Sequence, residues 1–176
     1  MKKFSVVLAS DDKNWIWKNG DLAWRIAEDL KYFKKITTSS CEWKSNAVIM
    51  WRKTWNSIPE KYRPLPKRIN CILSRTYNFE DTYGDIRKFS SFESALKNLS
   101  LDNNIDKIFI IGWWILYNKV LKDKNLEYIY NTKVFWDFDC DIFVDSIPEN
   151  FKIKEESEIK EDNDIKFIFQ VYKRED

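Results

Sequence analysis

The chain has 176 residues, of which 44% are hydrophobic and 33% are charged, and its formal net charge is +2. This length favours one domain, spanning residues 1–176, that buries roughly 70% of its unfolded surface. The small net charge argues against nucleic-acid or membrane partners, and no apolar run approaches the ~18 residues of a membrane span.

The first residues, MKKFSVVLASDDKNW, resemble a signal peptide only briefly. The apolar run is too short, and Asp11 and Asp12 follow it at once. We therefore expect these residues to form the first strand of a cytoplasmic protein. We also expect the protein to be a monomer whose substrate is a small molecule. Cys41, Cys71 and Cys140 are odd in number and widely spaced, and the chain has no histidine. They are expected to be reduced packing residues, with no metal site.

Predicted strands and helices alternate along the chain. Short apolar runs predict strands at residues 4–9, 47–50, 69–73, 86–89, 107–111 and 126–134. Helical spacing of apolar residues predicts helices at residues 25–36, 52–57, 91–99 and 115–121. Polar or proline-rich composition predicts loops at residues 11–21 and 58–68.

Ser91 suits the N-cap of the third predicted helix, with Glu93 in the first turn. Residues 151–159 and 165–172 predict a closing antiparallel hairpin around the EDND turn. This order of elements predicts an α/β fold, a single-domain three-layer sandwich. We expect a central, mostly parallel eight-stranded sheet with flanking helices and a C-terminal antiparallel hairpin.

Two residue counts are unusual for such a fold. The chain has 3 glycines and 9 tryptophans, whereas glycine makes up about 7% of ordinary proteins. Turns with positive φ need glycine, and tryptophan cannot replace it there. Gly112, Trp113 and Trp114 form the turn after the strand of residues 107–111. Such a turn often binds phosphate through bare backbone N–H groups, and two indole rings would fill that space.

Five segments carry the motifs of one enzyme family, in order along the chain. They are DLAWRIAEDLKYFKKIT, VIMWRKTWNSIP, RPLPKRINCILSR, IFIIGWWILY and TKVFWDFDCDIFV. From Phe4 to Tyr172 the chain resembles the dihydrofolate reductases. The resemblance implies NADPH-dependent reduction of 7,8-dihydrofolate to tetrahydrofolate, with hydride transfer to C6 and protonation of N5.

The resemblance also accounts for the unusual counts. Seven tryptophans fall where the family has or allows glycine, namely Trp15, Trp17, Trp43, Trp51, Trp113, Trp114 and Trp136. Trp24 and Trp55 fall where the family has tryptophan. Reading the seven as glycine raises the glycine count from 3 to ten and lowers the tryptophan count from 9 to two. We therefore hypothesise that seven UGA codons, written as tryptophan, are read as glycine by the source organism, as some bacterial lineages do.

The alternative is that the seven tryptophans are real. In the family the peptide bond that corresponds to Gly112–Trp113 is cis. A cis bond before a residue other than proline costs about 3–4 kcal/mol, which argues against tryptophan there.

Asp29 is the expected catalytic acid. It lies at the edge of the apolar stripe of residues 25–36, beside Leu30 and Phe33. Burial at such an edge raises a carboxyl pKa, and a carboxyl with a raised pKa can assist proton transfer to a ring nitrogen. Without the motif, Asp29 would be read as a solvated acid on a helix face.

The resemblance gives Asp29 partners. It implies that Asp29 hydrogen-bonds the pterin, that Thr132 hydrogen-bonds Asp29, and that Leu22 and Trp24 belong to the catalytic set. Glu28 is the competing acid, although the spacing from Trp24 to Asp29 fits the bacterial members better. Thr132 could instead be a buried threonine that bonds only to the backbone.

Arg68 is the expected anchor for the substrate. It follows RPLP and enters a strand, where a guanidinium can hold a carboxylate through two hydrogen bonds. The family uses this arginine for the α-carboxylate of the glutamate tail, and the alternative is a surface arginine. The remaining substrate residues also suit plain core packing: Val7, Leu30, Phe33, Ile58, Leu65, Ile111 and Tyr117.

Positive charge beside a helix start suggests where a cofactor binds. Arg52, Lys53 and Thr54 open a predicted helix, which suits a phosphate. By resemblance Ser74 and Arg75 contact the 2′-phosphate, which favours NADPH over NADH. The full expected cofactor set is Ala9, Ile16, Trp17, Trp51, Arg52, Lys53, Thr54, Leu73, Ser74, Arg75, Gly112, Trp113, Trp114, Ile115 and Leu116.

Two other functions stay open. The first is a related NADPH-dependent reductase of another pterin or of a pyrimidine intermediate of flavin synthesis. Arg68 favours folate, because a substrate without a glutamate tail has no need of it. The second is an inactive, decayed homologue or a non-catalytic binding protein. It requires real tryptophans, since Trp51, Trp113 and Trp114 would then block the cofactor.

Overall fold

The computed structural model describes residues 1–11, 13, 15–18, 21–22, 26–76, 81–136 and 142–175, with backbone alone for residues 15–18, 21–22, 81–83 and 142. These residues form two compact units. The first unit comprises Met1–Phe4 and Lys34–Trp113, and the second comprises Ser5–Phe33 and Trp114–Asp176.

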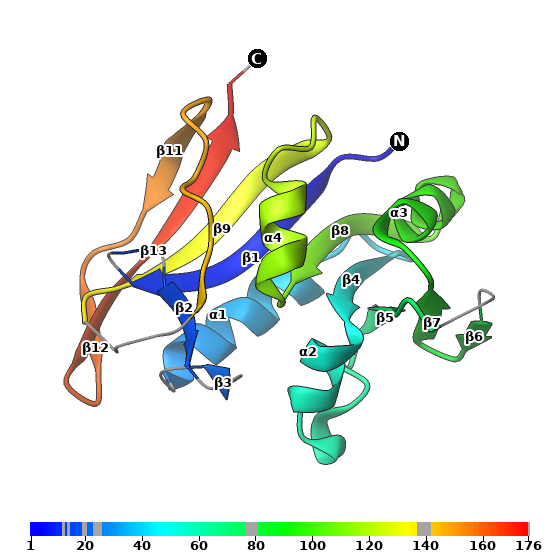
Figure 1. Ribbon diagram of the computed structural model, residues 1–176, viewed down its shortest axis with the longest axis horizontal. Helices are drawn as coiled ribbons and strands as arrows, with labels where there is room; N and C mark the ends of the chain where they lie inside the picture. Colours follow the sequence, from blue (N-terminus) through cyan, green and yellow to red (C-terminus); the bar gives the residue numbers. More distant parts are fainter. Residues whose placement is uncertain are drawn as a thin grey trace. The chain divides into compact units, whose positions relative to one another are not determined.

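The first unit is built on parallel strands (Figure 1). Its strand order is β8 (Ile105–Ile111), β4 (Ser45–Trp51), β5 (Arg68–Leu73), β7 (Ile86–Phe89) and β6 (Asp81–Tyr83). The first four run parallel, and β6 is antiparallel to β7. Residues 46–50 of β4 are all buried, as expected of a strand whose two faces are both covered.

Three helical segments connect these strands. They are α2 (Arg52–Ser57), the 3₁₀ turn η1 (Glu60–Tyr62) and α3 (Phe92–Leu101). Ser91 caps α3 as predicted, because its Oγ accepts a hydrogen bond from the Ser94 N–H at 3.1 Å. Phe92 of α3 meets Phe4 edge to face, with ring centroids 5.4 Å apart.

The second unit is mainly antiparallel. Its strand order is β11 (Phe151–Glu156), β13 (Ile165–Arg174), β9 (Leu126–Val134) and β1 (Phe4–Asp11), and β12 (Lys160–Asp162) pairs with β13. β13 runs antiparallel to β9, β11 and β12. Helix α4 (Trp114–Val120) belongs to this unit, and α1 (Ala27–Thr38) begins in it.

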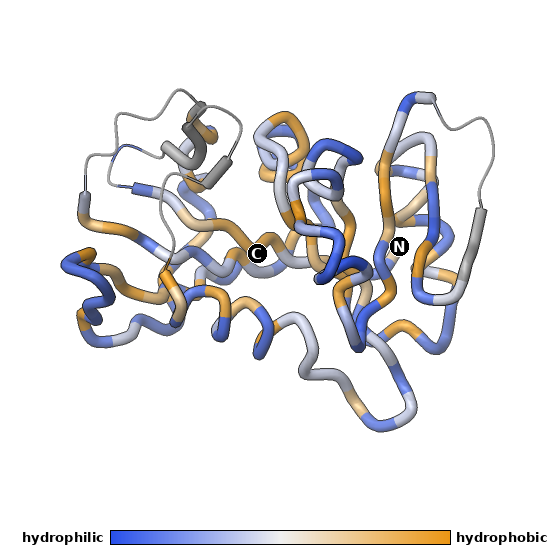
Figure 2. Tube along the Cα trace, turned by 90° about the horizontal axis from the view of Figure 1, so that it is seen from below, coloured by the Kyte–Doolittle hydropathy of each residue, from blue (hydrophilic) through white to orange (hydrophobic). Residues whose placement is uncertain are grey.

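Apolar residues make up the interior of each unit. In the second unit Ile26, Val134 and Phe167 form a buried cluster, against which Ala9 and Phe169 pack. Figure 2 shows that hydrophobic stretches follow the strands, whereas the turns between strands are largely hydrophilic. None of the helices within the described residues is long and apolar enough to span a bilayer.

The predicted α/β class, with parallel strands and antiparallel C-terminal strands, is confirmed. The described residues form more strands than the eight predicted. The short strands β6 and β12 extend the main strand pairings, and β2, β3 and β10 form a separate three-stranded sheet. The extent of the single domain, residues 1–176, stays a prediction.

The loop predicted at residues 11–21 is only partly a loop. β1 continues to Asp11, and β2 (Trp15–Lys18) pairs with β3 (Asp21–Leu22) and with β10 (Ile142–Phe143). Local composition could not show this, because β10 lies more than a hundred residues along the chain.

The closing hairpin also differs in detail. β12, not β11, faces β13 across the EDND turn, with Asp162 opposite Ile165, and β11 pairs with the far end of β13. Asn163 and Asp164 both have positive φ, at 52° and 63°. This is the requirement of a tight two-residue turn, and Asn and Asp meet it well.

Gly112–Trp113 corresponds to the cis bond of the family, but Arg63–Pro64 is the cis bond among the described residues of this chain. Gly112 and Trp113 instead take positive φ, at 70° and 72°. Cys71 is buried, as expected of a packing residue, and burial raises the pKa of its thiol to about 12. Cys41 is exposed, so the packing role expected of it is wrong. Cys140 lies outside the described residues.

Candidate active site

A partly buried acid and a buried threonine meet in the second unit. Asp29 lies in the first turn of α1, and Thr132, which is 2% exposed, lies on β9. Thr132 Oγ1 donates a hydrogen bond to Asp29 Oδ1 at 2.6 Å. Burial raises the pKa of Asp29, and the hydrogen bond from Thr132 opposes part of that rise. The expected contact and the expected direction of the pKa shift are both present.

Apolar and aromatic side chains around the start of α1 and on β13 accompany the burial that raises this pKa. Ile26 precedes α1 and is 2% exposed. Tyr32, one turn beyond Asp29, stacks on Phe169 with ring centroids 4.1 Å apart. A carboxyl beside such groups is poorly solvated, so its neutral form is favoured. It can then donate a hydrogen bond at a pH where an exposed aspartate cannot.

Two expected ligand residues are joined nearby in the second unit. The Tyr117 hydroxyl on α4 donates to the Val7 carbonyl on β1 at 2.8 Å, and both residues are buried. Leu116 is also buried, whereas Ile115 is 50% exposed and Leu30 is 60% exposed. Leu30 is therefore not a core residue, which removes the packing alternative for it.

Arg68 lies in the first unit, at the start of β5, and is 3% exposed. Its Nη1 donates to Thr37 Oγ1 at 2.7 Å, and its Nε donates to the Pro66 carbonyl at 3.1 Å. Burial lowers the pKa of Arg68 to about 10, so the guanidinium stays charged at neutral pH. The surface-arginine alternative is therefore wrong.

Sequence reasoning gave no role to the residues that support Arg68. Asn46 is buried and donates through Nδ2 to the Thr37 carbonyl at 2.9 Å. Asn70 donates to the Leu65 carbonyl and accepts from the Leu65 N–H, both at 3.0 Å. Asn70 stands inside the segment RPLPKRINCILSR and could have been found there. Thr37 gave no such signal, because its contact with Arg68 spans 31 positions.

The turn after β8 packs on α2 in the first unit. A Cβ placed on Gly112 would overlap the side chain of Thr54. Thr54 Oγ1 is buried, and no residue of the described part accepts or donates a hydrogen bond to it. A bare backbone and an unused hydroxyl suit an anionic cofactor group.

The positive residues of the expected cofactor set are partly connected. Arg52 Nη1 donates to Thr76 Oγ1 at 3.1 Å, and Thr76 Oγ1 also lies 2.8 Å from Ser74 Oγ. Arg75 is exposed at the end of β5, and Leu73 is buried. Thr76, which sequence reasoning did not single out, therefore links Arg52 to Ser74.

The tryptophans do not suit a cofactor at this place. Lys53 Nζ lies 4.5 Å from the centroid of the Trp113 ring. The indole therefore takes the position beside the lysine ammonium group where a phosphate would bind. Trp51 Nε1 is buried without a hydrogen-bond partner among the described residues. The backbone and Thr54 fit an anion, whereas the indole rings do not.

Four expected site residues have no described side chain. Trp24 falls outside the described residues. Ile16, Trp17 and Leu22 have a described backbone in β2 and β3 but no described side chain.

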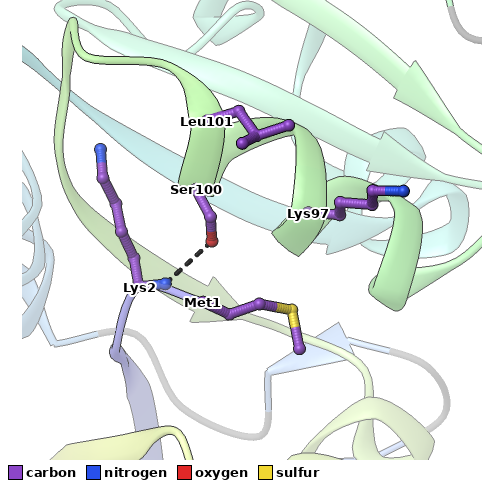
Figure 3. A pocket seen from close by; sticks show the side chains of 5 residues that line it. All are labelled: Met1, Lys2, Lys97, Ser100 and Leu101. Atoms are coloured by element: carbon purple, nitrogen blue, oxygen red, sulfur yellow. Dashed lines mark hydrogen bonds between the residues drawn. The ribbon is translucent and has the colours of Figure 1, made fainter.

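A shallow pocket of about 290 Å³ in the first unit is not this site. Figure 3 shows that Met1, Lys2, Lys97, Ser100 and Leu101 line it, and that the Lys2 N–H donates to Ser100 Oγ at 2.9 Å. It contains none of the predicted site residues.

An α/β fold with a partly buried acid of raised pKa is the arrangement of an α/β enzyme. A family model described as dihydrofolate reductase matches residues 3–174. The chain is 34% identical over 180 residues to the dihydrofolate reductase of Drosophila melanogaster, covering 99% of both chains. It is 36% identical over 187 residues to that of Rattus norvegicus, covering 100% of both chains. The chain belongs to the dihydrofolate reductase family, whose members use a nicotinamide cofactor.

Proposed function

We propose that this protein reduces 7,8-dihydrofolate to 5,6,7,8-tetrahydrofolate with NADPH, by hydride transfer to C6 and protonation of N5. The observation that carries the proposal is the partly buried Asp29, whose Oδ1 accepts a hydrogen bond from the Thr132 hydroxyl at 2.6 Å and whose pKa is raised. The reductases of Drosophila melanogaster and Rattus norvegicus support the same activity.

Asp29 assists the protonation of N5. A carboxyl with a raised pKa keeps its proton to higher pH than an ordinary aspartate and offers a donor to the pterin ring. Thr132 holds Oδ1, which leaves the other carboxyl oxygen for the substrate. Leu22 and Trp24 complete the catalytic set in this proposal.

Arg68 holds the glutamate tail of the substrate. Thr37 and the Pro66 carbonyl fix the orientation of the guanidinium. A fixed, planar cation pairs with a carboxylate at a smaller loss of side-chain entropy than a mobile one. The apolar groups of the substrate are proposed to contact the remaining set: Val7, Leu30, Phe33, Ile58, Leu65, Ile111 and Tyr117.

The preference for NADPH over NADH rests on Ser74 and Arg75, proposed to contact the 2′-phosphate. Arg75 is exposed at the end of β5, and a guanidinium pairs well with a phosphate. We place the protein in the cytoplasm as a monomer.

Replacing Arg68 tests the substrate. Arg68→Ala should weaken dihydrofolate binding at least about tenfold, or roughly 1.4 kcal/mol, because the carboxylate loses its partner. Isothermal titration without cofactor measures this, and circular dichroism checks the fold.

A pterin without a glutamate tail is the control ligand. Its affinity should be the same for the parent and for Arg68→Ala. Equal dihydrofolate affinity in parent and variant would instead favour a related reductase with another substrate.

A further inference from the structure

Trp43 occupies a backbone conformation that suits glycine. The Lys44 N–H donates to the Cys41 carbonyl at 3.3 Å and closes a four-residue turn. The third residue of this turn, Trp43, has φ 63°, whereas Glu42 before it is not in the positive-φ region. A turn with positive φ at its third position requires glycine or asparagine there. The Trp43 side chain is 95% exposed, so no packing offsets the strain.

Trp113 repeats the anomaly in the turn after β8. Gly112 and Trp113 have φ 70° and 72°, so two consecutive residues are left-handed. Only glycine adopts this region freely, and a bulky side chain there is a genuine outlier. The one glycine of the pair is also the residue whose Cβ would overlap Thr54.

Other residues with positive φ mostly obey the rule. Five non-glycine residues of the described part have positive φ, and two of them are Asn163 and Asp164, which tolerate it. Lys67 is the remaining exception beside the two tryptophans. Trp51 is unfavourable for another reason, since its buried Nε1 lacks a partner among the described residues.

Trp55 shows how a tryptophan that suits its position differs. It lies inside α2 with ordinary helical backbone, and the Arg63 guanidinium lies 5.4 Å from the centroid of its ring. A cation over an indole is a stabilising contact. Backbone strain therefore falls on two of the tryptophans that the sequence marks as glycine positions, Trp43 and Trp113, and not on Trp55.

We infer that the native protein has glycine at seven positions where the sequence has tryptophan, because its organism reads UGA as glycine. The positions are those of Trp15, Trp17, Trp43, Trp51, Trp113, Trp114 and Trp136. This one change explains three observations: the positive φ of Trp43 and Trp113, the buried Trp51 N–H without a hydrogen-bond partner among the described residues, and the count of 3 glycines against 9 tryptophans. The inference holds whatever the substrate is.

Glycine at these positions also resolves the misfit at the cofactor. Without the Trp113 ring, Lys53 is released from its 4.5 Å indole contact and can face an anion. Without the Trp51 ring, the buried indole N–H disappears. The backbone of residues 112–113 and the Thr54 hydroxyl then remain as a cradle for a phosphate.

The mass of one peptide of the native protein tests the inference directly. Trypsin cleaves after Lys107 and Lys119 and releases IFIIGWWILYNK. The peptide should be lighter than written by twice the difference between the tryptophan and glycine residue masses. A peptide with both tryptophans would overturn the inference.

The codons give a second, independent test. UGA is expected at all seven positions, and UGG is expected at Trp24 and Trp55. UGA at all nine tryptophans would indicate a code that reads UGA as tryptophan, and UGG at the seven would indicate the ordinary code. Either result would overturn the inference.

Two recombinant chains separate the inference from the proposed function. One is the chain as written, and the other has all seven tryptophans replaced by glycine. NADPH should bind the glycine chain at least about tenfold more tightly, as measured by isothermal titration. Measurable NADPH binding of equal affinity in the two chains would contradict the inference. If neither chain binds NADPH, the proposed function fails, and the peptide mass still decides the inference.

Discussion

At the scale of the residue, two opposing effects set the pKa of Asp29. Burial raises its pKa, and the Thr132 hydroxyl lowers it again in part. The folded-state pKa lies above the ordinary value, so the neutral acid stabilises the fold fully below that ordinary value. This stabilisation is lost as the pH rises through the folded-state pKa. Asp29 therefore costs stability at the pH where it is ionised, as expected of a residue kept for chemistry.

Thr132→Val tests this balance. The valine removes the hydrogen bond that lowers the pKa of Asp29, so that pKa should rise further. Because the reaction uses the protonated acid, the fall of kcat/KM with rising pH should move to higher pH. Thr132→Ser keeps the hydroxyl and should keep the parent profile. Coincident valine and serine profiles, measured in the glycine chain, would remove Thr132 from the proposed site.

Trp43 offers a test of backbone strain alone. Left-handed φ costs a residue with a Cβ roughly 1–2 kcal/mol, and glycine avoids this at a cost of about 0.5–1 kcal/mol in chain entropy. Trp43→Gly should therefore stabilise the protein, by about 0.5–1 kcal/mol in urea unfolding. Trp43→Ala removes the same exposed ring but keeps the Cβ, so it should give no gain. An equal effect of both substitutions would show that the ring, not φ, matters.

At the scale of the element, the start of α1 depends on a distant strand. The Ala27 N–H donates to Asp162 Oδ2 on β12 at 2.8 Å, 135 positions along the chain. Lys160 of the same strand forms an ion pair with Glu28, with its Nζ 3.3 Å from Glu28 Oε2. An exposed ion pair of this kind adds little, so the carboxylate cap is the larger contribution.

Asp162→Ala should weaken the helix that carries Asp29. Loss of a capping acceptor typically costs about 1 kcal/mol, which urea unfolding would detect. Asp162→Asn keeps a side-chain acceptor and should lie close to the parent. If alanine and asparagine have the same stability, the cap contributes nothing.

Elements with a strong local pattern could be predicted from the sequence. The apolar runs of β4, β5, β8 and β9 gave strands, and Ser91 gave the start of α3. Elements whose existence depends on a distant partner could not be predicted. β2 is an example, because the residues of β2 alone do not indicate that it pairs with the distant strand β10.

At the scale of the whole molecule, the site residues also divide into those that local motifs predict and those that depend on distant contacts. Asp29, Thr132 and Arg68 followed from motifs, and the direction of the Asp29 pKa shift followed from the apolar stripe. The Thr37 contact and the Asn46 support could not be predicted, because tertiary packing brings them to Arg68.

Residues 1–176 are predicted to unfold as one monomeric domain. Circular dichroism and calorimetry should show a single, coincident thermal transition, because two-state behaviour is usual for one domain. The transition temperature should not depend on protein concentration, since no subunit dissociates. Two separated transitions would refute the single domain, and a concentration dependence would refute the monomer.

The contact between Arg63 and Trp55 in the first unit has an optical consequence. With glycine at the seven positions, Trp24 and Trp55 are the two indoles of the chain. The intrinsic fluorescence of the native protein would then come from two rings, one of which has a guanidinium against its face. Since indole emission responds to a nearby charge, the emission spectrum would report on the Arg63 loop in solution without any added label.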